Sequence, residues 1–311
     1  MLRLNMKKIL SSVVFAGLFA IGSTAALAQG PNLLSSAALI LDASSGESIY
    51  AKNASTVTPI ASITKLMTAM VVLDADLFLD EKLEVTLDDL DYLKASRSRL
   101  SMGSVLTRRE MLQLALMSSE NRAASALGRH YPGGVIAAVK AMNAKAASLG
   151  MTHTRFVDTS GLSPENVSTA RELAMLVTAA QRYPLIAQFS TQADQYVDID
   201  SSGKTLHFNN SNALVKSEGW DISLQKTGFI REAGRCVVMF TKIAQRPVVM
   251  VLLDSVGKYS RLGDAQRVKT WMETGEVLEI PKPVVYKKSK AKAKGKGKAT
   301  RGKIVAKKRK R

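Results

Sequence analysis

Three short motifs follow one another along this chain of 311 residues and constrain both its fold and its chemistry. They are Ser62-Ile63-Thr64-Lys65, Ser119-Glu120-Asn121 and Lys226-Thr227-Gly228. The first pattern, Ser-x-x-Lys, says little by itself because it recurs at Ser201, Ser255 and Ser289, whereas the other two patterns each occur once. Motifs so far apart in the sequence act together only where the fold brings them to one cleft.

The spacing of the first motif suits a serine nucleophile. A serine hydroxyl is a weak nucleophile at neutral pH and needs an adjacent base. On a helix Lys65 lies one turn from Ser62 on the same face, so its amine can reach the hydroxyl. Burial and a neighbouring cation such as Lys226 lower the pKa of an amine and free it to act as that base. The N-terminus of the helix also favours a developing oxyanion.

The residue pattern predicts strands near both ends of the chain and helices between them. Strand pairs are expected at 37–42 with 47–51 and at 235–243 with 247–254. Helices are expected at 63–73, after the Thr107/Glu110 capping box, in a stretch that ends at Leu127 before Gly128, and at 260–274. We therefore expect an α/β fold of the α+β type, in which one antiparallel sheet from both chain ends carries flanking helices and an all-helical insertion.

In that arrangement each motif lies at a junction. Ser62 opens a helix, Ser119-Glu120-Asn121 interrupts two helices, and Lys226-Thr227-Gly228 precedes the apolar strands. A cleft is expected between the sheet and the insertion.

The net charge of +18 is concentrated at the chain ends. Residues 282–311 hold 15 Lys and Arg and no acid, residues 1–28 hold three basic residues, and residues 29–281 are neutral overall. Arg3, Lys7 and Lys8 precede an apolar run at 9–21 and the small-residue site at 26–28, which predicts a secretory signal, with Met6 as a second candidate start. That apolar run is too short to span a bilayer.

The sequence thus predicts a signal peptide at 1–28, a catalytic domain at 29–281 and a disordered Lys/Arg-rich tail at 282–311. We expect the tail to be attracted to an anionic envelope surface. Export and a neutral body argue against nucleic acid as a partner.

Cysteine and histidine usage excludes several other classes of site. Cys236 is the single cysteine, so no internal disulfide forms, and its place in an apolar strand pattern indicates a core residue. The three histidines show no metal-ligand spacing. We expect neither a metal nor a cofactor.

These motifs give residues 36–279 a close resemblance to the low-molecular-mass penicillin-binding proteins, in particular the D-alanyl-D-alanine endopeptidase (penicillin-binding protein 7) type. The resemblance implies a β-lactamase/DD-peptidase-like fold and a periplasmic serine DD-peptidase, soluble or peripherally bound to the membrane. It also implies that the enzyme hydrolyses D-alanyl bonds of peptidoglycan stem peptides and cross-links and is acylated by β-lactams.

The same resemblance implies a role for each motif residue. Ser62 would be the acylated nucleophile, Lys65 the general base and Ser119 the relay of a proton to the leaving amine. Asn121 would hold the substrate amide, Lys226 and Thr227 would bind the substrate carboxylate, and the backbone N–H groups of Ser62 and Phe229 would form the oxyanion hole. Gly228 has a mechanical reason of its own, because a residue without Cβ lets a substrate lie against the strand edge.

The sequence leaves several alternatives for the bond that is cut and for the activity. The resemblance implies that a carboxypeptidase of this family would carry a β-rich second domain and an amphipathic C-terminal anchor after the catalytic part, whereas the residues after the expected terminal helix are nearly all tail. The resemblance therefore favours an endopeptidase of D-alanyl to diaminopimelate cross-links over a D-alanyl-D-alanine carboxypeptidase. A serine β-lactamase shares the motifs but needs rapid deacylation, for which Glu165 is a candidate. A polyanion-binding envelope protein that works through the tail is a further alternative.

Overall fold

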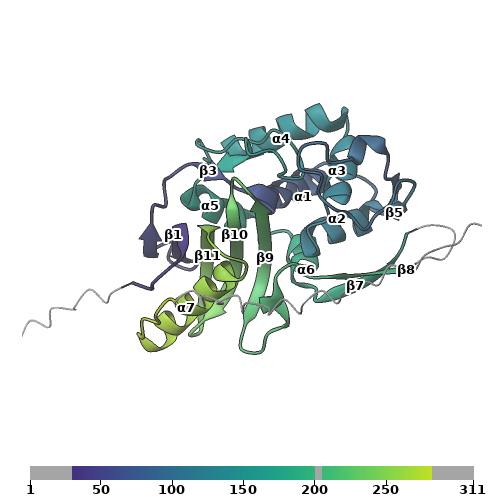
Figure 1. Cartoon of the computed structure of the whole chain (residues 1–311). Helices are drawn as coiled ribbons and strands as arrows, with labels where there is room; N and C mark the ends of the chain where they lie inside the picture. The colour runs from purple at the N-terminus through teal and green to yellow at the C-terminus, as the bar shows by residue number, and fades with distance from the viewer. Residues whose placement is uncertain (1–29, 200–204, 282–311) are drawn as a thin grey trace, which may run out of the picture. The chain divides into compact units, whose positions relative to one another are not determined.

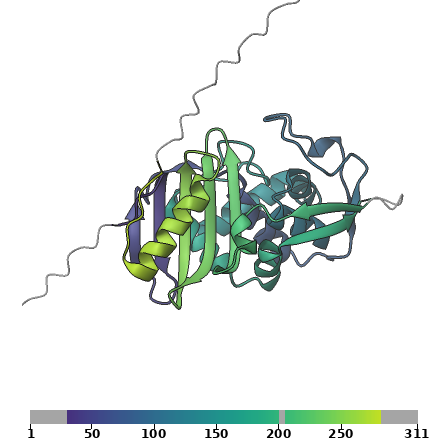
Figure 2. The same cartoon turned by 60° about the horizontal axis from the view of Figure 1, so that its bottom comes forward.

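A computed structural model describes residues 30–199 and 205–281. Its main sheet has five antiparallel strands in the order β2-β1-β11-β10-β9 (Figures 1 and 2). The strands are β1 (Ser35–Asp42), β2 (Ser48–Lys52), β9 (Asp221–Ile230), β10 (Gly234–Ile243) and β11 (Arg246–Ser255). The sheet is built from strands near both ends of the described residues, and both predicted strand pairs are confirmed.

The sheet is covered by helices on both faces. Helix α7 (Ser260–Thr274) packs on one face, as Figure 2 shows, and α5 (Ala170–Ala180) packs on the other. Successive residues of a strand point to opposite faces, so Ile40 lies in the cluster under α7 and Leu39 lies in the larger core with the remaining helices. The predicted terminal helix at 260–274 is confirmed.

A buried carboxylate ties the beginning of β1 to α7. Asp264 accepts hydrogen bonds from the backbone N–H groups of Leu34 (2.9 Å) and Ser35 (2.7 Å). The hydroxyl of Ser255 at the end of β11 donates to it at 3.1 Å, and the Arg267 guanidinium pairs with it. One side chain therefore joins three elements that are distant in the sequence.

The insertion between β2 and β9 is mainly helical, with α1 (Thr64–Asp74), α2 (Arg108–Met117), α3 (Asn121–Arg129), α4 (Gly134–Ser148), α5 and α6 (Pro184–Thr191). It is not all-helical, since it also holds three short strand pairs. These are β3 (Thr58–Pro59) with β6 (Val167–Ser168), β4 (Lys82–Glu84) with β5 (Val105–Thr107), and β7 (Asp194–Asp198) with β8 (Thr205–Asn209). Strands of two to five residues are too short to give a recognisable alternation.

Of two helix boundaries predicted in the insertion, the start of α2 is confirmed and the end of α3 is wrong. The Thr107/Glu110 capping box begins α2, as expected. The expected end of a helix at Leu127 is wrong, because α3 continues through Gly128 to Arg129. Gly128 is explained by packing: a Cβ there would lie 2.6 Å from Cγ2 of Thr159.

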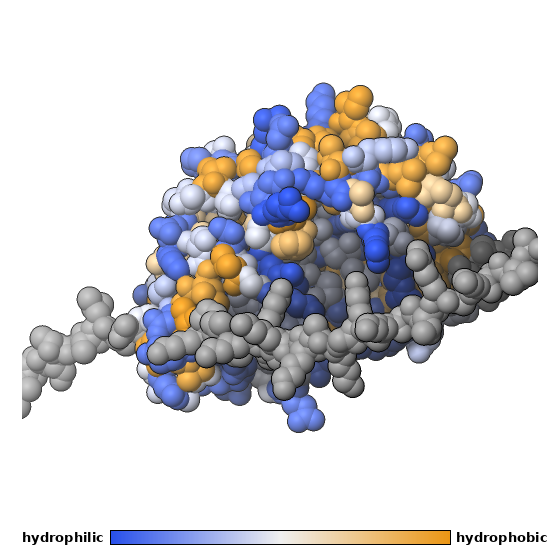
Figure 3. All heavy atoms as spheres, in the orientation of Figure 1, coloured by the Kyte–Doolittle hydropathy of each residue, from blue (hydrophilic) through white to orange (hydrophobic). Residues whose placement is uncertain are grey.

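The surface carries hydrophilic and hydrophobic residues intermixed on the face seen in Figure 3. No helix within residues 30–199 and 205–281 is long and apolar enough to cross a membrane. The predicted signal at 1–28 and the tail at 282–311 lie outside the described residues.

Candidate active site

The nucleophile candidate is held on a tight turn. Ser62 is the middle residue of a 3₁₀ turn, η1 (Ala61–Ile63), and α1 begins at Thr64, one residue after the expected start of this helix at 63. Ala61 has a φ of +47°, a left-handed conformation that L-residues seldom adopt. Ser62 itself is half-buried and lines a cavity.

Lys65 reaches back from the first turn of α1 to the hydroxyl of Ser62, with Nζ and Oγ 2.8 Å apart. Its amine also donates to Oδ1 of Asn121 (2.8 Å) and to the carbonyl of Ser160 (2.5 Å). A neutral amine has two N–H donors and one lone pair. Two bonds to acceptors leave the lone pair free to accept the Ser62 proton.

The electrostatic environment favours that neutral form. Complete burial lowers the pKa of Lys65 from 10.5 to about 7, although the carboxylates of Asp158 and Glu120 pull in the opposite direction. The predicted lowering of this pKa therefore comes chiefly from desolvation.

The second motif lies between α2 and α3, as predicted. Ser119 has a φ of +63°, and its Oγ accepts a hydrogen bond from Nζ of Lys226 at 2.8 Å. Asn121 is the first residue of α3 and donates through Nδ2 to Oγ of Ser96 at 2.9 Å. Both polar ends of the Asn121 amide are therefore fixed, one by Lys65 and the other by Ser96.

The third motif lies inside β9, before the apolar strands β10 and β11 as predicted, and β9 is the edge strand of the sheet. Lys226 is fully buried, and burial, followed by the positive charges of Lys65 and Arg261, holds its pKa well below the ordinary value. Thr227 donates to Oγ of Ser211 at 2.8 Å.

Gly228 is explained by the protein's own backbone. A Cβ at this position would lie 2.9 Å from the carbonyl oxygen of Ile60 and 3.2 Å from the backbone nitrogen of Ser62. This differs from the expected reason, the approach of a substrate to the strand edge. The glycine lets β9 pack directly against the turn that displays Ser62, and Phe229, the next residue, is 54% exposed at the cavity.

The motifs meet at a cleft between the sheet and the insertion, as predicted. A cavity of about 730 Å³ is lined by Ser62, Asn121 and Leu162, by the loop 92–96, and by residues 229–232 at the end of β9. The structure therefore gathers all eight predicted site residues around one cleft or directly behind its wall.

Three residues that contribute to the site belong to none of the three sequence motifs. Ser160 supplies the carbonyl that accepts from Lys65, and Gly161 packs so closely that a Cβ would lie 2.0 Å from the carbonyl oxygen of Ala61. Arg261 in α7 acts electrostatically on Lys226, and its Nε and Nη1 atoms are buried without a hydrogen-bond partner. A guanidinium with two unpartnered N–H groups is suited to a carboxylate ligand.

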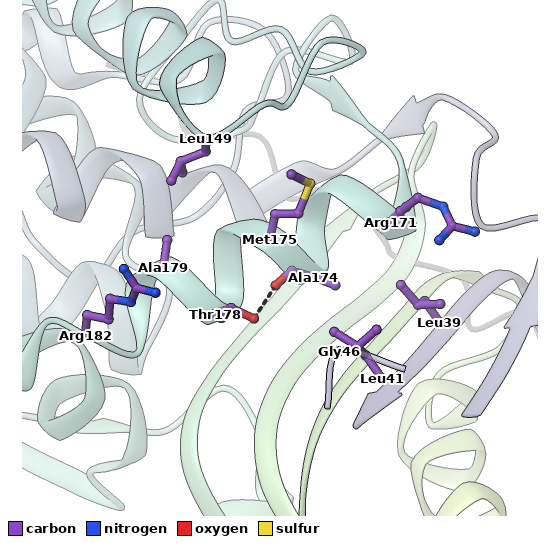
Figure 4. A pocket seen from close by; sticks show the side chains of 10 residues that line it. All are labelled: Leu39, Leu41, Gly46, Leu149, Arg171, Ala174, Met175, Thr178, Ala179 and Arg182. Atoms are coloured by element: carbon purple, nitrogen blue, oxygen red, sulfur yellow. Dashed lines mark hydrogen bonds between the residues drawn. The ribbon is translucent and has the colours of Figure 1, made fainter. Parts of the chain in front are cut away.

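Three other features of the described residues lie outside the Ser62 cavity. Cys236 is buried and its pKa is raised to about 11, mainly by desolvation, which confirms the core assignment. Glu165 is exposed, pairs with Arg155 at 3.1 Å and is not part of the lining of the Ser62 cavity. A separate pocket of about 380 Å³ along α5 is lined mostly by apolar side chains, with Arg171 and Arg182 at its two ends (Figure 4).

Comparison with known proteins decides the family. The family model described as D-alanyl-D-alanine carboxypeptidase, Peptidase_S11, matches residues 24–257. The chain belongs to this family. It is therefore a serine DD-peptidase, and the Peptidase_S11 fold agrees with the α+β architecture expected from the sequence.

Two relatives of this Peptidase_S11 protein match over most of their length. It is 50% identical over 274 residues to the D-alanyl-D-alanine endopeptidase of Escherichia coli (strain K12), covering 87% of this chain and 88% of that protein. It is 51% identical over 249 residues to the D-alanyl-D-alanine endopeptidase of Pseudomonas aeruginosa, covering 80% of each.

Solved structures of DD-peptidase type have the same fold. The Streptomyces K15 DD-transpeptidase superposes with a TM-score of 0.72 at 26% identity, over 78% of this chain and 98% of that one. Penicillin-binding protein D2 from Listeria monocytogenes, in its ampicillin-bound form, superposes with a TM-score of 0.66 at 30% identity, over 76% and 96%.

Proposed function

We propose that this protein is a DD-endopeptidase that hydrolyses D-alanyl to diaminopimelate cross-links of peptidoglycan through an acyl-enzyme on Ser62. The observation that carries the proposal is the hydrogen bond between the Lys65 amine and the Ser62 hydroxyl, made by a lysine whose pKa is about 7. The two relatives at 50% and 51% identity, both named endopeptidases, favour the cross-link over the terminal D-alanine as the bond that is cut.

Acylation follows from the positions of the groups. Lys65 takes the hydroxyl proton of Ser62 as Oγ attacks the D-alanyl carbonyl carbon. The developing oxyanion is bound by the backbone N–H groups of Ser62 and Phe229. Ser119 passes a proton to the leaving amine, and the hydrogen bond from Lys226 to Ser119 supplies the path by which that proton arrives. Water then hydrolyses the ester.

The substrate carboxylate is bound by the cationic end of the site. Lys226 and Thr227 lie on the edge strand, and Arg261 of α7 adds a positive charge that acts on Lys226 and has two N–H groups without a partner. A carboxylate that binds there favours the protonated form of Lys226, whose pKa is low in the free enzyme. Asn121, held by Lys65 and Ser96, is oriented to bind the substrate amide.

Purified muropeptides test the proposal. Wild type is expected to convert cross-linked dimers to monomers without releasing D-alanine from pentapeptide monomers, and Ser62→Ala is expected to be inactive. Activity in Ser62→Ala would refute the assignment. Release of terminal D-alanine without dimer cleavage would instead identify a carboxypeptidase.

A fluorescent penicillin tests the acyl-enzyme. The ampicillin-bound form of penicillin-binding protein D2 supports a β-lactam as a ligand of this protein too. Wild type is expected to hold the label persistently, and Ser62→Ala is expected not to be labelled. Rapid turnover of the label would identify a serine β-lactamase instead.

We also propose the division into a signal peptide (1–28), a catalytic domain (29–281) and a basic tail (282–311), with export to the periplasm. The tail would add electrostatic attraction to an anionic envelope surface, at about 1 kcal/mol for each basic residue near it. Truncation after Pro281 is expected to abolish salt-sensitive retention in the envelope fraction. Unchanged retention would contradict this role.

A further inference from the structure

An ion pair spans the cleft beside the nucleophile. Nζ of Lys94, from a loop of the insertion, lies 2.5 Å from Oε1 of Glu232, in the turn between β9 and β10. Both residues line the same cavity as Ser62. The pair is partly exposed, at 27% for the Lys94 side chain and 41% for that of Glu232, so a ligand that enters the cavity can reach both charges.

The loop that carries Lys94 has a defined conformation. The carboxylate of Asp91 accepts hydrogen bonds from the backbone N–H groups of Leu93 (2.9 Å), Lys94 (2.8 Å) and Ser96 (2.8 Å). Ser96 in turn accepts from Asn121 of the second motif. The base of the Lys94 side chain is therefore fixed relative to the catalytic groups, while its ammonium group remains at the mouth of the cavity.

The proposed function gives the substrate a direction along β9. Its carboxylate end lies at Lys226 and Thr227, and the carbonyl under attack lies between Ser62 and the N–H of Phe229. The acyl side of the substrate then continues past Ile230 toward Glu232. The residue before the reacting D-alanine in the donor stem is diaminopimelate, whose side chain ends in an ammonium and a carboxylate group.

We propose that Lys94 and Glu232 form a subsite for this zwitterionic end of the donor-stem diamino acid. The Lys94 ammonium binds the substrate carboxylate, and the Glu232 carboxylate binds the substrate ammonium. The inference rests on the proposed function and deepens it by naming a side chain that the enzyme selects.

The exchange of partners keeps every charge paired. Before binding, the two protein charges neutralise one another; after binding, each is neutralised by one half of the zwitterion, so no charge is left without a partner. The hydrogen bond from Lys94 lowers the pKa of Glu232, which keeps this carboxylate ionised at neutral pH. Arg231 also lines this cavity, and the Asp91 carboxylate is occupied by the loop N–H groups.

Two cross-linked dimers that differ only in the donor-stem diamino acid test the subsite. One carries diaminopimelate, and the other carries lysine, which keeps the ammonium and lacks the carboxylate. Lys94→Gln is expected to lower kcat/KM for the diaminopimelate dimer about tenfold and not to lower it for the lysine dimer. Glu232→Gln is expected to lower kcat/KM for both dimers, because both present the ammonium.

Matched controls separate this subsite from the catalytic assignment. Lys269→Gln breaks an ion pair with Glu273 on α7 and is expected to change neither dimer. Lys269→Gln is also expected to be acylated by penicillin at the wild-type rate. Equal effects of Lys94→Gln on the two dimers, or no effect on either, would overturn the proposal. If the enzyme does not cut cross-links at all, the same comparison is made with two pentapeptides, one with diaminopimelate and one with lysine. The rate measured is then the release of terminal D-alanine by wild type and by each variant.

Discussion

Acylation of Ser62 by a β-lactam is expected to decline on the acid side with a midpoint near pH 7. Lys65 must be neutral to take the hydroxyl proton, and its pKa is lowered from 10.5 to about 7 by burial. At pH 7 about half of the enzyme then holds the base form, whereas an unshifted lysine would be neutral in about 0.03% of molecules. Burial thus raises the available base about a thousandfold, and each pH unit below the midpoint lowers the rate about tenfold.

Glu120→Gln tests the sign of this argument. The Glu120 carboxylate raises the pKa of Lys65, so its neutralisation lowers that pKa and leaves the amine unprotonated at lower pH. The acid limb of the variant is therefore expected at lower pH than that of wild type. The assay is the rate of labelling by a fluorescent penicillin between about pH 5 and pH 9, with Ser62→Ala as the background. A wild-type midpoint above pH 9, or a limb that moves to higher pH in the variant, would refute the mechanism.

Three further predictions concern residues that hold the fold or the site in place. Asp264→Ala is expected to lower the free energy of unfolding in urea by about 3–5 kcal/mol, since it leaves a buried cation and several donors unpaired; a loss below about 1 kcal/mol would contradict this. Gly161→Ala is expected to slow penicillin acylation at least about tenfold, because its Cβ would overlap the Ala61 carbonyl and its φ is +83°. Ser96→Ala is expected to lower peptide kcat/KM about threefold to tenfold by freeing the Asn121 amide, and wild-type turnover would show that this hydrogen bond is dispensable.

The parts of the site that sequence predicts are those with local geometry or a distinctive pattern. Lys65 lies one helical turn from Ser62, so the spacing alone predicts their contact. The Thr107/Glu110 capping box marks the beginning of α2 by the same kind of local rule. The order of the strands in the main sheet was not predicted, because it depends on pairings between residues far apart in the chain.

The parts that sequence misses depend on long-range packing. Ser160 contributes a backbone carbonyl, a group that every residue possesses, so its identity gave no signal. Arg261 lies in a helix that packs on the far side of the sheet from α5, and only the fold brings its charge near Lys226. Gly128 indicated a helix end, but its real cause is the close approach of Thr159.

Two strained residues beside the site, Ala61 and Ser119, are held in place by contacts with the third motif. Ala61, directly before the nucleophile, and Ser119 in the second motif both have positive φ, at a cost of about 1–3 kcal/mol each. Such conformations persist only where the surroundings hold them. Gly228 of the third motif packs against the Ile60 carbonyl and the Ser62 nitrogen, and the Lys226 amine bonds the Ser119 hydroxyl. The packing of Gly228 and the hydrogen bond of Lys226 therefore help to hold the turn that carries Ser62 and the hydroxyl of Ser119 in place.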